Sequence, residues 1–352
     1  MSRFWSERVA GLEPYKPGEQ PQVSGMVKLN TNENPYGPSP QVLAALKAHI
    51  TDDLRRYPDP ESTQLRDALA QRFSLNRQQV FVGNGSDEVL AHVFHGLLQH
   101  PQPVLFPDIT YSFYTTYARL YDVSYRMIPL DENFALNVED YRQPNGGILI
   151  ANPNAPTGRF LDLSALRSLL RFNTDSVVVV DEAYIDFGGQ SAATMIADFP
   201  NLLVVQTFSK SWSLAGMRVG FAMGQEPLIE ALNRIKNSFN SYPLDRLAQQ
   251  AAVAALQDVA WFAKTTQAIV DSREQLTQGL VDLGFSVLPS AANFLMVSHP
   301  RPAREICADL RSKHIFVRHF AGGRIDNWLR VTVGLPEENH RLLLALQAML
   351  VS

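Results

Sequence analysis

The stretch NLLVVQTFSKSWSLAGMRVGFAMG, residues 201–224, places a lysine shortly after a run of apolar residues. LLVV at 202–205 has the length and composition of a buried strand, and RVGFAMG at 218–224 predicts a second strand. Lys210 lies between them in a Ser-Lys-Ser cluster. Because lysine is rarely buried without a partner or a purpose, Lys210 is either a solvated loop residue or a functional one.

Strand and helix patterns alternate before this stretch. Apolar runs such as VFVG at 80–83, GILIANP at 147–153 and SVVVVDEAY at 176–184 are separated by turns and by segments with helical spacing. Continuous apolar strands of this kind are typical of a parallel sheet that is buried on both faces. Their alternation with helices predicts a doubly wound α/β domain.

The pattern changes after about residue 245. A long helical region rich in Ala and Gln, over 245–283, leads to short strands such as NFLMVS and WLRVTVG, which are separated or followed by helical segments. The sequence therefore predicts three parts. They are an N-terminal arm over 1–40, a large α/β domain over 41–245, and a small α+β domain over 246–352 to which the arm contributes.

The composition is that of a globular protein without a strong charge. The 352 residues are 45% hydrophobic and carry a net charge of −4, so no global basic field invites nucleic acid. The single cysteine, Cys307, allows no intramolecular disulfide, and the eight histidines show no metal spacing. No apolar run approaches the roughly 20 residues of a membrane span, and the N-terminus lacks the apolar stretch of a signal peptide. We therefore expect a cytoplasmic protein with no metal and no membrane partner.

Two polar clusters at strand ends offer binding groups. GNGSDE at 83–88 can turn tightly and present backbone N–H groups to an anion, although the same pattern also suits a simple helix N-cap. DEAY at 181–184 places a carboxylate at the carboxyl end of a strand, where α/β sheets bind ligands. Asp181 suits a protonated ring nitrogen there, and Tyr184 suits a phenolate-like oxygen, although an isolated Asp could simply cap a turn.

The third cluster is the opening stretch. A lysine amine in a dry pocket can lose its proton and form an imine with an aldehyde, which is a role open to Lys210. Ser209 and Arg218 offer a hydroxyl and a guanidinium for a phosphate. Together the three clusters supply phosphate binders, a carboxylate, a tyrosine and an imine-forming lysine. That set matches pyridoxal 5′-phosphate (PLP), a cofactor that stores electrons after C–H cleavage.

The chain resembles the fold-type I PLP-dependent aminotransferases, and among them the histidinol-phosphate aminotransferase family. The resemblance covers nearly the whole chain, and its specificity lies in the order and spacing of its motifs. These are LEPYKPG at 12–18, KLNTNENPYGPSP at 28–40, RRYPDP at 55–60, GNGSDE, PNAPTG at 153–158, DEAYIDF at 181–187, TFSKSWSLAGMRVGF at 207–221 and LRVTVG at 329–334. It implies an α/β large domain with a mostly parallel sheet flanked by helices, plus a smaller α+β domain.

The resemblance also implies a role for each cofactor residue. Lys210 would hold PLP as a Schiff base and shuttle the substrate's proton. Asp181 would keep the pyridine nitrogen protonated, and Tyr184 would hydrogen-bond the ring's 3-oxygen. Tyr111 would stack on the ring, and the phosphate would be held by Gly85, Ser86, Asp87, Ser209 and Arg218.

Two further positions carry the resemblance less directly. Tyr57, in RRYPDP, would reach the phosphate of the partner subunit's cofactor, which implies a homodimer with shared active sites. Its local pattern alone indicates only an exposed turn.

The family often has a second Asn that bonds the cofactor's 3-oxygen, where this chain has Ala155. Asn154 could compensate through a shifted backbone, or Tyr184 could serve alone.

Substrate recognition would fall to Arg318 and Arg330, whose forked guanidinium groups suit both a phosphate and a carboxylate. Tyr15 and Asn32 lie in N-terminal segments that would cover the pocket. The implied reaction moves the amino group of L-histidinol phosphate to 2-oxoglutarate in histidine biosynthesis. The alternatives are an aromatic amino acid aminotransferase, a phosphothreonine-type PLP decarboxylase, and a ligand sensor that retained the fold.

Overall fold

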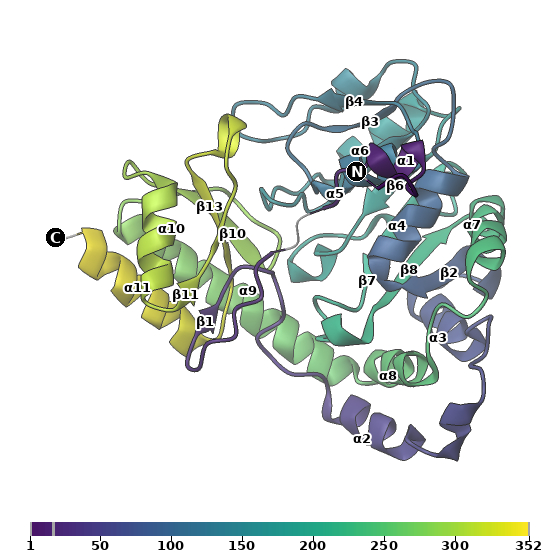
Figure 1. Ribbon diagram of the computed structural model, residues 1–352, viewed down its shortest axis with the longest axis horizontal. Helices are drawn as coiled ribbons and strands as arrows, with labels where there is room; N and C mark the ends of the chain where they lie inside the picture. Colours follow the sequence, from purple (N-terminus) through teal and green to yellow (C-terminus); the bar gives the residue numbers. More distant parts are fainter. Residues whose placement is uncertain (1, 16–17, 351–352) are drawn as a thin grey trace.

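The computed structural model describes residues 2–15 and 18–350, and a seven-stranded sheet lies within its larger part (Figure 1). The strand order is β2-β8-β7-β6-β5-β3-β4. Neighbouring strands are parallel except where β8 pairs with β2 and β7. The strands are β2 (Val80–Asn84), β3 (Val104–Pro107), β4 (Tyr125–Ile128), β5 (Ile148–Ala151), β6 (Val178–Asp181), β7 (Leu202–Thr207) and β8 (Val219–Gly224).

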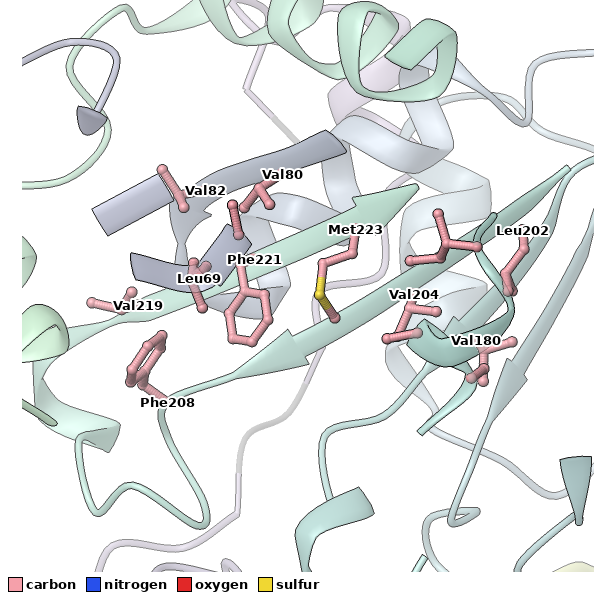
Figure 2. Packing of buried hydrophobic residues seen from close by; sticks show 14 of the residues in the cluster. Leu69, Val80, Val82, Val180, Leu202, Val204, Phe208, Val219, Phe221 and Met223 are labelled. Atoms are coloured by element: carbon pink, nitrogen blue, oxygen red, sulfur yellow. The ribbon is translucent and has the colours of Figure 1, made fainter. Parts of the chain in front are cut away.

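Helices bury this sheet on both faces, because its central strands carry apolar side chains on both faces. In β6, for example, Val178 and Val180 enter one hydrophobic cluster and Val179 enters the other. Figure 2 shows part of the first cluster, in which Phe221 and Met223 of β8 lie near Val204 of β7. Its helices are α2 (Pro40–His49), α3 (Thr63–Phe73), α6 (Leu163–Phe172) and α8 (Arg246–Gln257). The opposite cluster contains residues of α4 (Gly85–Gly96), α5 (Phe113–Leu120) and α7 (Glu226–Phe239).

A smaller antiparallel sheet follows, in the order β12-β13-β10-β9. The N-terminal arm joins this part of the molecule, since β1 (Val27–Lys28) pairs in parallel with β11 (Ile315–Phe316) (Figure 1). The strands are β9 (Ser286–Val287), β10 (Phe294–Ser298), β12 (Arg318–His319) and β13 (Trp328–Thr332), and the helices are α9 (Val259–Asp282), α10 (Ala303–Ser312) and α11 (Pro336–Leu350). The two sheets confirm the α/β fold with a smaller α+β part that the sequence predicts.

The division at residues 40 and 245 stays a prediction, and the packing bears on its second boundary. The whole of α8 packs into the core of the large sheet, from Ala248 to Leu256. In α9, Phe262 packs against that same core, whereas Leu276 and Leu280 belong to the core of the small sheet. The hydrophobic contacts therefore favour a boundary inside α9 rather than before α8.

Short elements complete the described chain. They are helix α1 (Glu7–Ala10) and the 3₁₀ turns Asp52–Arg55, Arg77–Gln79, Val138–Tyr141, Ile185–Phe187, Ala192–Met195, Ala215–Met217 and Gly323–Ile325. Within residues 2–15 and 18–350, no helix is both long and apolar enough to span a membrane.

Candidate active site

A cavity of about 320 Å³ lies at the carboxyl ends of β6 and β7, between the large sheet and the arm. This is the edge at which α/β sheets bind ligands. Most of the residues singled out in the sequence line it. From the large sheet they are Ser86, Asp87, Tyr111, Asp181, Tyr184, Ser209, Lys210 and Arg218, and from the arm and the small sheet they are Tyr15, Asn32, Arg318 and Arg330.

Lys210 lies in the loop that follows β7, and its amine reaches the cavity. Its Nζ donates to the Thr31 carbonyl at 3.3 Å and lies 5.6 Å from the centre of the Tyr184 ring. Asn34 Nδ2 donates to the carbonyls of Lys210 and Ser211, at 3.0 and 3.2 Å, and so ties this loop to the arm. Lys210 forms no ion pair within the described part of the chain. An amine with so few competing partners is available to a ligand.

Asp181 is the last residue of β6, and it is buried with 5% exposure. Its carboxylate accepts hydrogen bonds from the Tyr114 hydroxyl at 2.8 Å and from the Ala183 N–H at 3.2 Å. Burial raises the pKa of Asp181 to about 6, and these hydrogen bonds offset only part of the cost of removing the charge from water. The carboxylate would therefore gain from a cationic group placed in the cavity.

An anion cradle forms where the N-terminus of α4 meets Arg218. Arg218 Nη2 donates to Asp87 Oδ2 at 2.9 Å, and Nη1 lies 3.5 Å from Ser209 Oγ. Gly85 has a φ of +78°, and a Cβ there would lie 2.5 Å from Arg218 Nη2. A Cβ on Gly220 would lie 2.3 Å from the Ser86 nitrogen. A side chain at Gly85 would meet the Arg218 guanidinium, and one at Gly220 would meet the backbone at the start of α4. The two glycines therefore allow close packing at this helix N-terminus, which suits a phosphate.

Two tyrosines complete the wall formed by the large sheet. The Tyr111 hydroxyl donates to Asp87 Oδ1 at 3.1 Å, and its ring lies edge-on to Tyr114. The Tyr184 hydroxyl accepts a hydrogen bond from Asn32 Nδ2 at 3.0 Å. Both side chains line the cavity, and the hydroxyl of each is held by a residue of another element.

Arg318 and Arg330 face each other across the paired strands β12 and β13. Like charges in such a pair repel unless an anion lies between or beside them. Arg330 Nη2 donates to the Asn30 carbonyl at 2.9 Å, and burial lowers the pKa of Arg330. Its Nε has no hydrogen-bond partner within the described residues. Both guanidinium groups also lie over the Phe320 ring, which leaves a compact cationic site for an anionic substrate group.

Three of the predicted residues, Gly85, Asn154 and Tyr57, do not line this cavity. Asn154 is buried beside it, where Nδ2 donates to the Ile109 carbonyl and to Thr157 Oγ1, each at 2.9 Å. Its Oδ1 accepts from Thr110 Oγ1, so its polar atoms are occupied by the neighbouring loops. Ala155, not Asn154, lines the cavity. Tyr57 is 79% exposed and stacks on Tyr242, 4.6 Å between ring centres, outside the cavity of its own chain.

Several residues of the site were missed by the sequence analysis. Tyr114 holds Asp181, and its place three residues after Tyr111 in a helical pattern is a signal that could have identified it. Glu33 lines the cavity and pairs with Lys28, while Thr31 Oγ1 donates to it at 2.7 Å. Burial acts to raise the pKa of Glu33, but the contacts of Lys28 and Thr31 outweigh it and lower that pKa.

The residues present fit PLP. The buried carboxylate of Asp181 suits the pyridine nitrogen, the cradle at Gly85 and Arg218 suits the phosphate, and Lys210 suits the aldehyde. No cluster of three His, Cys, Asp or Glu side chains that could hold a metal occurs in residues 2–15 and 18–350.

Comparisons with known proteins point the same way. The family model of the class I and II aminotransferases matches residues 24–346. Histidinol-phosphate aminotransferase 1 of Pseudomonas aeruginosa is 60% identical over 98% of this chain and 99% of its own length. Histidinol-phosphate aminotransferase 2 of Dechloromonas aromatica is 58% identical, with 99% of each chain covered.

Solved structures share the fold at lower identity. Histidinol-phosphate aminotransferase from Sinorhizobium meliloti, solved in complex with PLP, superposes with a TM-score of 0.89 at 24% identity and covers 100% of this chain and 98% of its own. Aspartate aminotransferase from Thermus thermophilus with maleate superposes with a TM-score of 0.83 at 20% identity, over 99% and 100% of the two chains.

Proposed function

The chain belongs to the class I and II aminotransferase family, and on that premise we propose that it is a PLP-dependent histidinol-phosphate aminotransferase. It would move the amino group of L-histidinol phosphate to 2-oxoglutarate, giving imidazole-acetol phosphate and glutamate in histidine biosynthesis. The observation that carries the proposal is the convergence of Lys210, Asp181 and the Arg218–Asp87 pair on one cavity.

The cofactor residues divide the work of binding among them. When bound, PLP supplies an aldehyde that links to amines and a ring that accepts electrons as a C–H bond breaks. Asp181 would favour a protonated ring nitrogen, because a cation relieves the cost of its buried charge. Tyr111 would cover one face of the ring. Ser209, Arg218 and the N–H groups at Gly85–Asp87 would hold the phosphate.

Lys210 would act twice. Its amine would hold the cofactor until the substrate amine displaces it. Freed in this way, Nζ would remain near the reacting carbon, because Asn34 fixes the main chain of its loop. A neutral amine in that position can take the substrate's proton and return it to another carbon.

Arg318 and Arg330 would recognise both substrates. Histidinol phosphate carries a phosphate and 2-oxoglutarate carries a carboxylate, and a guanidinium can make paired hydrogen bonds to either group. Tyr15, whose ring lies 4.6 Å from that of Phe113, and Phe320 would cover the substrate and exclude water. The substrate thus changes between half-reactions while the anion site stays the same.

The proposal includes a homodimer in the cytoplasm. Tyr57 lies outside its own chain's cavity, and its exposed ring is free to reach the phosphate site of a partner. The single cysteine permits no intramolecular disulfide, which is compatible with a reducing compartment. Size-exclusion chromatography with light scattering tests the dimer, and cell fractionation tests the compartment.

A visible absorption spectrum of the PLP-loaded protein tests the activity. L-histidinol phosphate should remove the band of the lysine-bound cofactor, and 2-oxoglutarate should restore it. A response to phenylalanine but not to L-histidinol phosphate would favour an aromatic amino acid aminotransferase, and release of CO₂ from a phosphorylated amino acid would favour a decarboxylase. Failure to form any such band with added PLP would contradict the proposal.

A further inference from the structure

Asn32 connects three parts of the molecule beneath the cavity. The residue is buried with 1% exposure, and its backbone has a φ of +57°, which few non-glycine residues adopt. Its N–H donates to Thr332 Oγ1 at 3.0 Å, and its carbonyl accepts from Asn293 Nδ2 at 3.1 Å. These bonds fix the main chain of Asn32 against the small sheet, while its side chain extends to Tyr184 of the large sheet.

Thr332 determines which way the Asn32 amide faces. The Thr332 hydroxyl accepts from the Asn32 N–H and donates its one proton to Asn32 Oδ1 at 3.0 Å. With the amide reversed, that proton would lack an acceptor within the described residues, and Thr332 is only 2% exposed. A buried hydroxyl rarely leaves its proton unpaired. The NH₂ end of Asn32 must therefore face the Tyr184 oxygen, 3.0 Å away.

This arrangement settles the direction of the Tyr184 hydroxyl. A phenol has one proton to donate, and here its oxygen already accepts a hydrogen bond from Asn32. Its proton has no acceptor within the described part of the chain, and the Tyr184 side chain lines the cavity. The proton is therefore free to be donated to a group bound there.

We propose that Asn32 is a positioning residue that keeps Tyr184 a hydrogen-bond donor toward the cofactor's 3-oxygen. The inference rests on the proposed PLP function, and it revises the expectation that Asn32 binds substrate. Ala155 makes the direction of the Tyr184 proton more important. It lines the cavity without a polar side chain, and Asn154 spends its own amide on neighbouring loops. Tyr184 is then the donor that remains for that oxygen in this part of the site. The direction of its proton therefore matters more here than in a site where a second residue also donates to the 3-oxygen.

The consequence appears in the protonation of the bound cofactor. A hydrogen bond donated to the 3-oxygen stabilises its anion and so favours loss of the proton that this oxygen shares with the lysine nitrogen. Weakening that bond should therefore raise the pH midpoint at which the bound cofactor's visible band changes. Complete loss of a hydrogen bond to a charged oxygen corresponds to a rise of about 1–2 pH units, so weakening it corresponds to roughly 0.5–1 unit.

The test is a spectral pH titration of the PLP-loaded protein without substrate. Asn32→Gly removes the amide and suits the left-handed backbone, and it should raise the midpoint by roughly 0.5–1 unit. Tyr184→Phe should raise the midpoint at least as much. Adding Asn32→Gly to Tyr184→Phe should cause no further rise, because Asn32 acts through the hydroxyl that Phe lacks.

Two variants of Thr332 separate positioning from a general effect on folding. Thr332→Val removes the hydroxyl that donates to Asn32 Oδ1 and so orients the amide, and it should raise the midpoint by a smaller amount. Thr332→Ser keeps this donor and should leave the midpoint unchanged. These variants also test the inference if Asn32→Gly retains too little cofactor. Circular dichroism checks that each variant is folded.

Two results would overturn the inference. In one, Asn32→Gly and Thr332→Val bind PLP with the wild-type midpoint, which would make Asn32 a structural residue only. In the other, Asn32→Gly raises the midpoint equally with and without the Tyr184 hydroxyl, which would mean that Asn32 acts on the cofactor by another route. Failure of the wild-type protein to form a lysine-bound PLP band contradicts the proposed function instead.

Discussion

The two walls of the cavity are held in place by different kinds of contact. The sheet wall, comprising Asp87, Asp181, Ser209, Lys210 and Arg218, comes from the large sheet, and most of its hydrogen bonds join residues within that domain. The arm wall, comprising Tyr15, residues 30–33, Arg318, Phe320 and Arg330, depends on bonds between residues 300 positions apart, such as Asn32 with Thr332 and Arg330 with Asn30.

This difference suits the sheet wall to holding a cofactor and the arm wall to binding substrate. A wall fixed by a buried sheet can hold a cofactor through many reaction cycles, since its strands cannot shift without disturbing both hydrophobic cores. A wall fixed by long-range polar contacts depends on how the arm and the small sheet pack together. Changes in the sheet wall should therefore affect chemistry and cofactor binding, and changes in the arm wall should affect substrate affinity.

The largest effect is expected at Lys210 of the sheet wall. In the proposed function, Lys210→Ala would remove both the covalent attachment of the cofactor and the group that carries the proton. Loss of an acid–base group alone costs about 10²–10⁴-fold, so turnover should fall by at least about 10⁴-fold while circular dichroism stays unchanged. Wild-type turnover in this variant would show that Lys210 is an ordinary loop residue.

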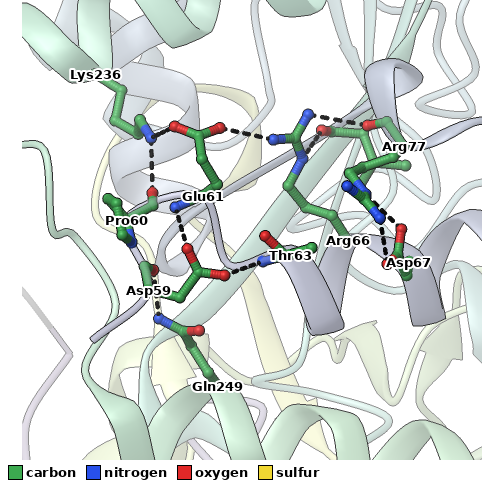
Figure 3. A network of polar contacts seen from close by, with 10 residues as sticks. Asp59, Pro60, Glu61, Thr63, Arg66, Asp67, Arg77, Lys236 and Gln249 are labelled. Atoms are coloured by element: carbon green, nitrogen blue, oxygen red, sulfur yellow. Dashed lines mark hydrogen bonds and ion pairs between the residues drawn. The ribbon is translucent and has the colours of Figure 1, made fainter.

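A buried lysine outside the cavity provides the matched control. Lys236 of α7 is 3% exposed and donates to the Pro60 carbonyl at 2.9 Å and to Glu61 at 3.4 Å, which in turn pairs with Arg66 (Figure 3). It lies in a structural network away from the cavity. Lys236→Ala should lower the free energy of unfolding by about 1–3 kcal/mol and leave kcat of the folded protein nearly unchanged.

The next effect concerns Asp181 and the pH dependence of stability. Burial raises its pKa from 3.8 to about 6 in the cofactor-free protein. The unfolded chain therefore loses this proton first, so the stabilising contribution is fully present below pH 3.8 and is lost as the pH rises through about 6. At 1.36 kcal/mol per unit, the loss is about 3 kcal/mol. Urea unfolding at pH 4 and pH 7.5 should show that Asp181→Asn gains about this much relative to wild type at the higher pH.

Glu182 makes the comparison sharper, because it is adjacent in sequence but does not line the cavity. It accepts hydrogen bonds from Ser191, Ala192 and Gln206, and burial raises its pKa to about 7. Glu182→Gln should show the same sign of pH dependence. Added PLP should cancel the cost of the Asp181 charge and leave that of Glu182 unchanged. An equal response of both positions to PLP would contradict the pairing of Asp181 with the cofactor.

On the arm wall, Arg330→Gln should weaken substrate binding rather than chemistry. Hydrogen bonds to charged groups are worth about 1.5–3 kcal/mol, so KM should rise roughly 10–100-fold for both L-histidinol phosphate and 2-oxoglutarate. The spectrum of the bound cofactor should stay the same. Arg341→Gln is a control for loss of charge, since Arg341 donates to the Gly25 carbonyl and does not line the cavity. A rise in only one of the two KM values would show that the substrates use different anion sites.

The sequence predicted the sheet wall well for a physical reason. Its residues follow continuous apolar runs, and strands buried on both faces place their carboxyl ends at one edge of a sheet. Asp181 after VVVV and Lys210 after LLVVQTFS could therefore be brought together without a structure. Gly85 was also expected from GNGSDE, but Gly220 needed the structure, because the short distance that excludes a Cβ there depends on how β8 packs against the start of α4.

The arm wall was harder to predict, because its contacts have no local pattern. Nothing in NTNENP indicates that Asn32 would meet Thr332, and nothing in the strand around Arg330 indicates the Asn30 carbonyl as its partner. Asn154 shows the same difficulty within the large domain. A one-residue shift from the usual Asn looked able to compensate for Ala155, but the loops at Ile109 and Thr157 occupy its amide.

The smallest effect is expected at Tyr57, which belongs to neither wall of its own chain. If its hydroxyl donates to the phosphate in a partner subunit, Tyr57→Phe should raise the dissociation constant of PLP about 3–10-fold, the equivalent of one hydrogen bond of about 1 kcal/mol. Tyr242→Phe is the matched control, because Tyr242 stacks on Tyr57 and keeps the ring contact in both variants.

The effect of Tyr57→Phe on PLP binding should depend on the oligomeric state. PLP binding is measured by fluorescence at protein concentrations above and below the point at which the proposed dimer would dissociate. The difference between wild type and Tyr57→Phe should be present in the dimer and vanish in the monomer, because no Tyr57 then reaches a second cavity. A difference of the same size in the monomer would place the Tyr57 hydroxyl in its own subunit's site, against its 79% exposure outside that cavity.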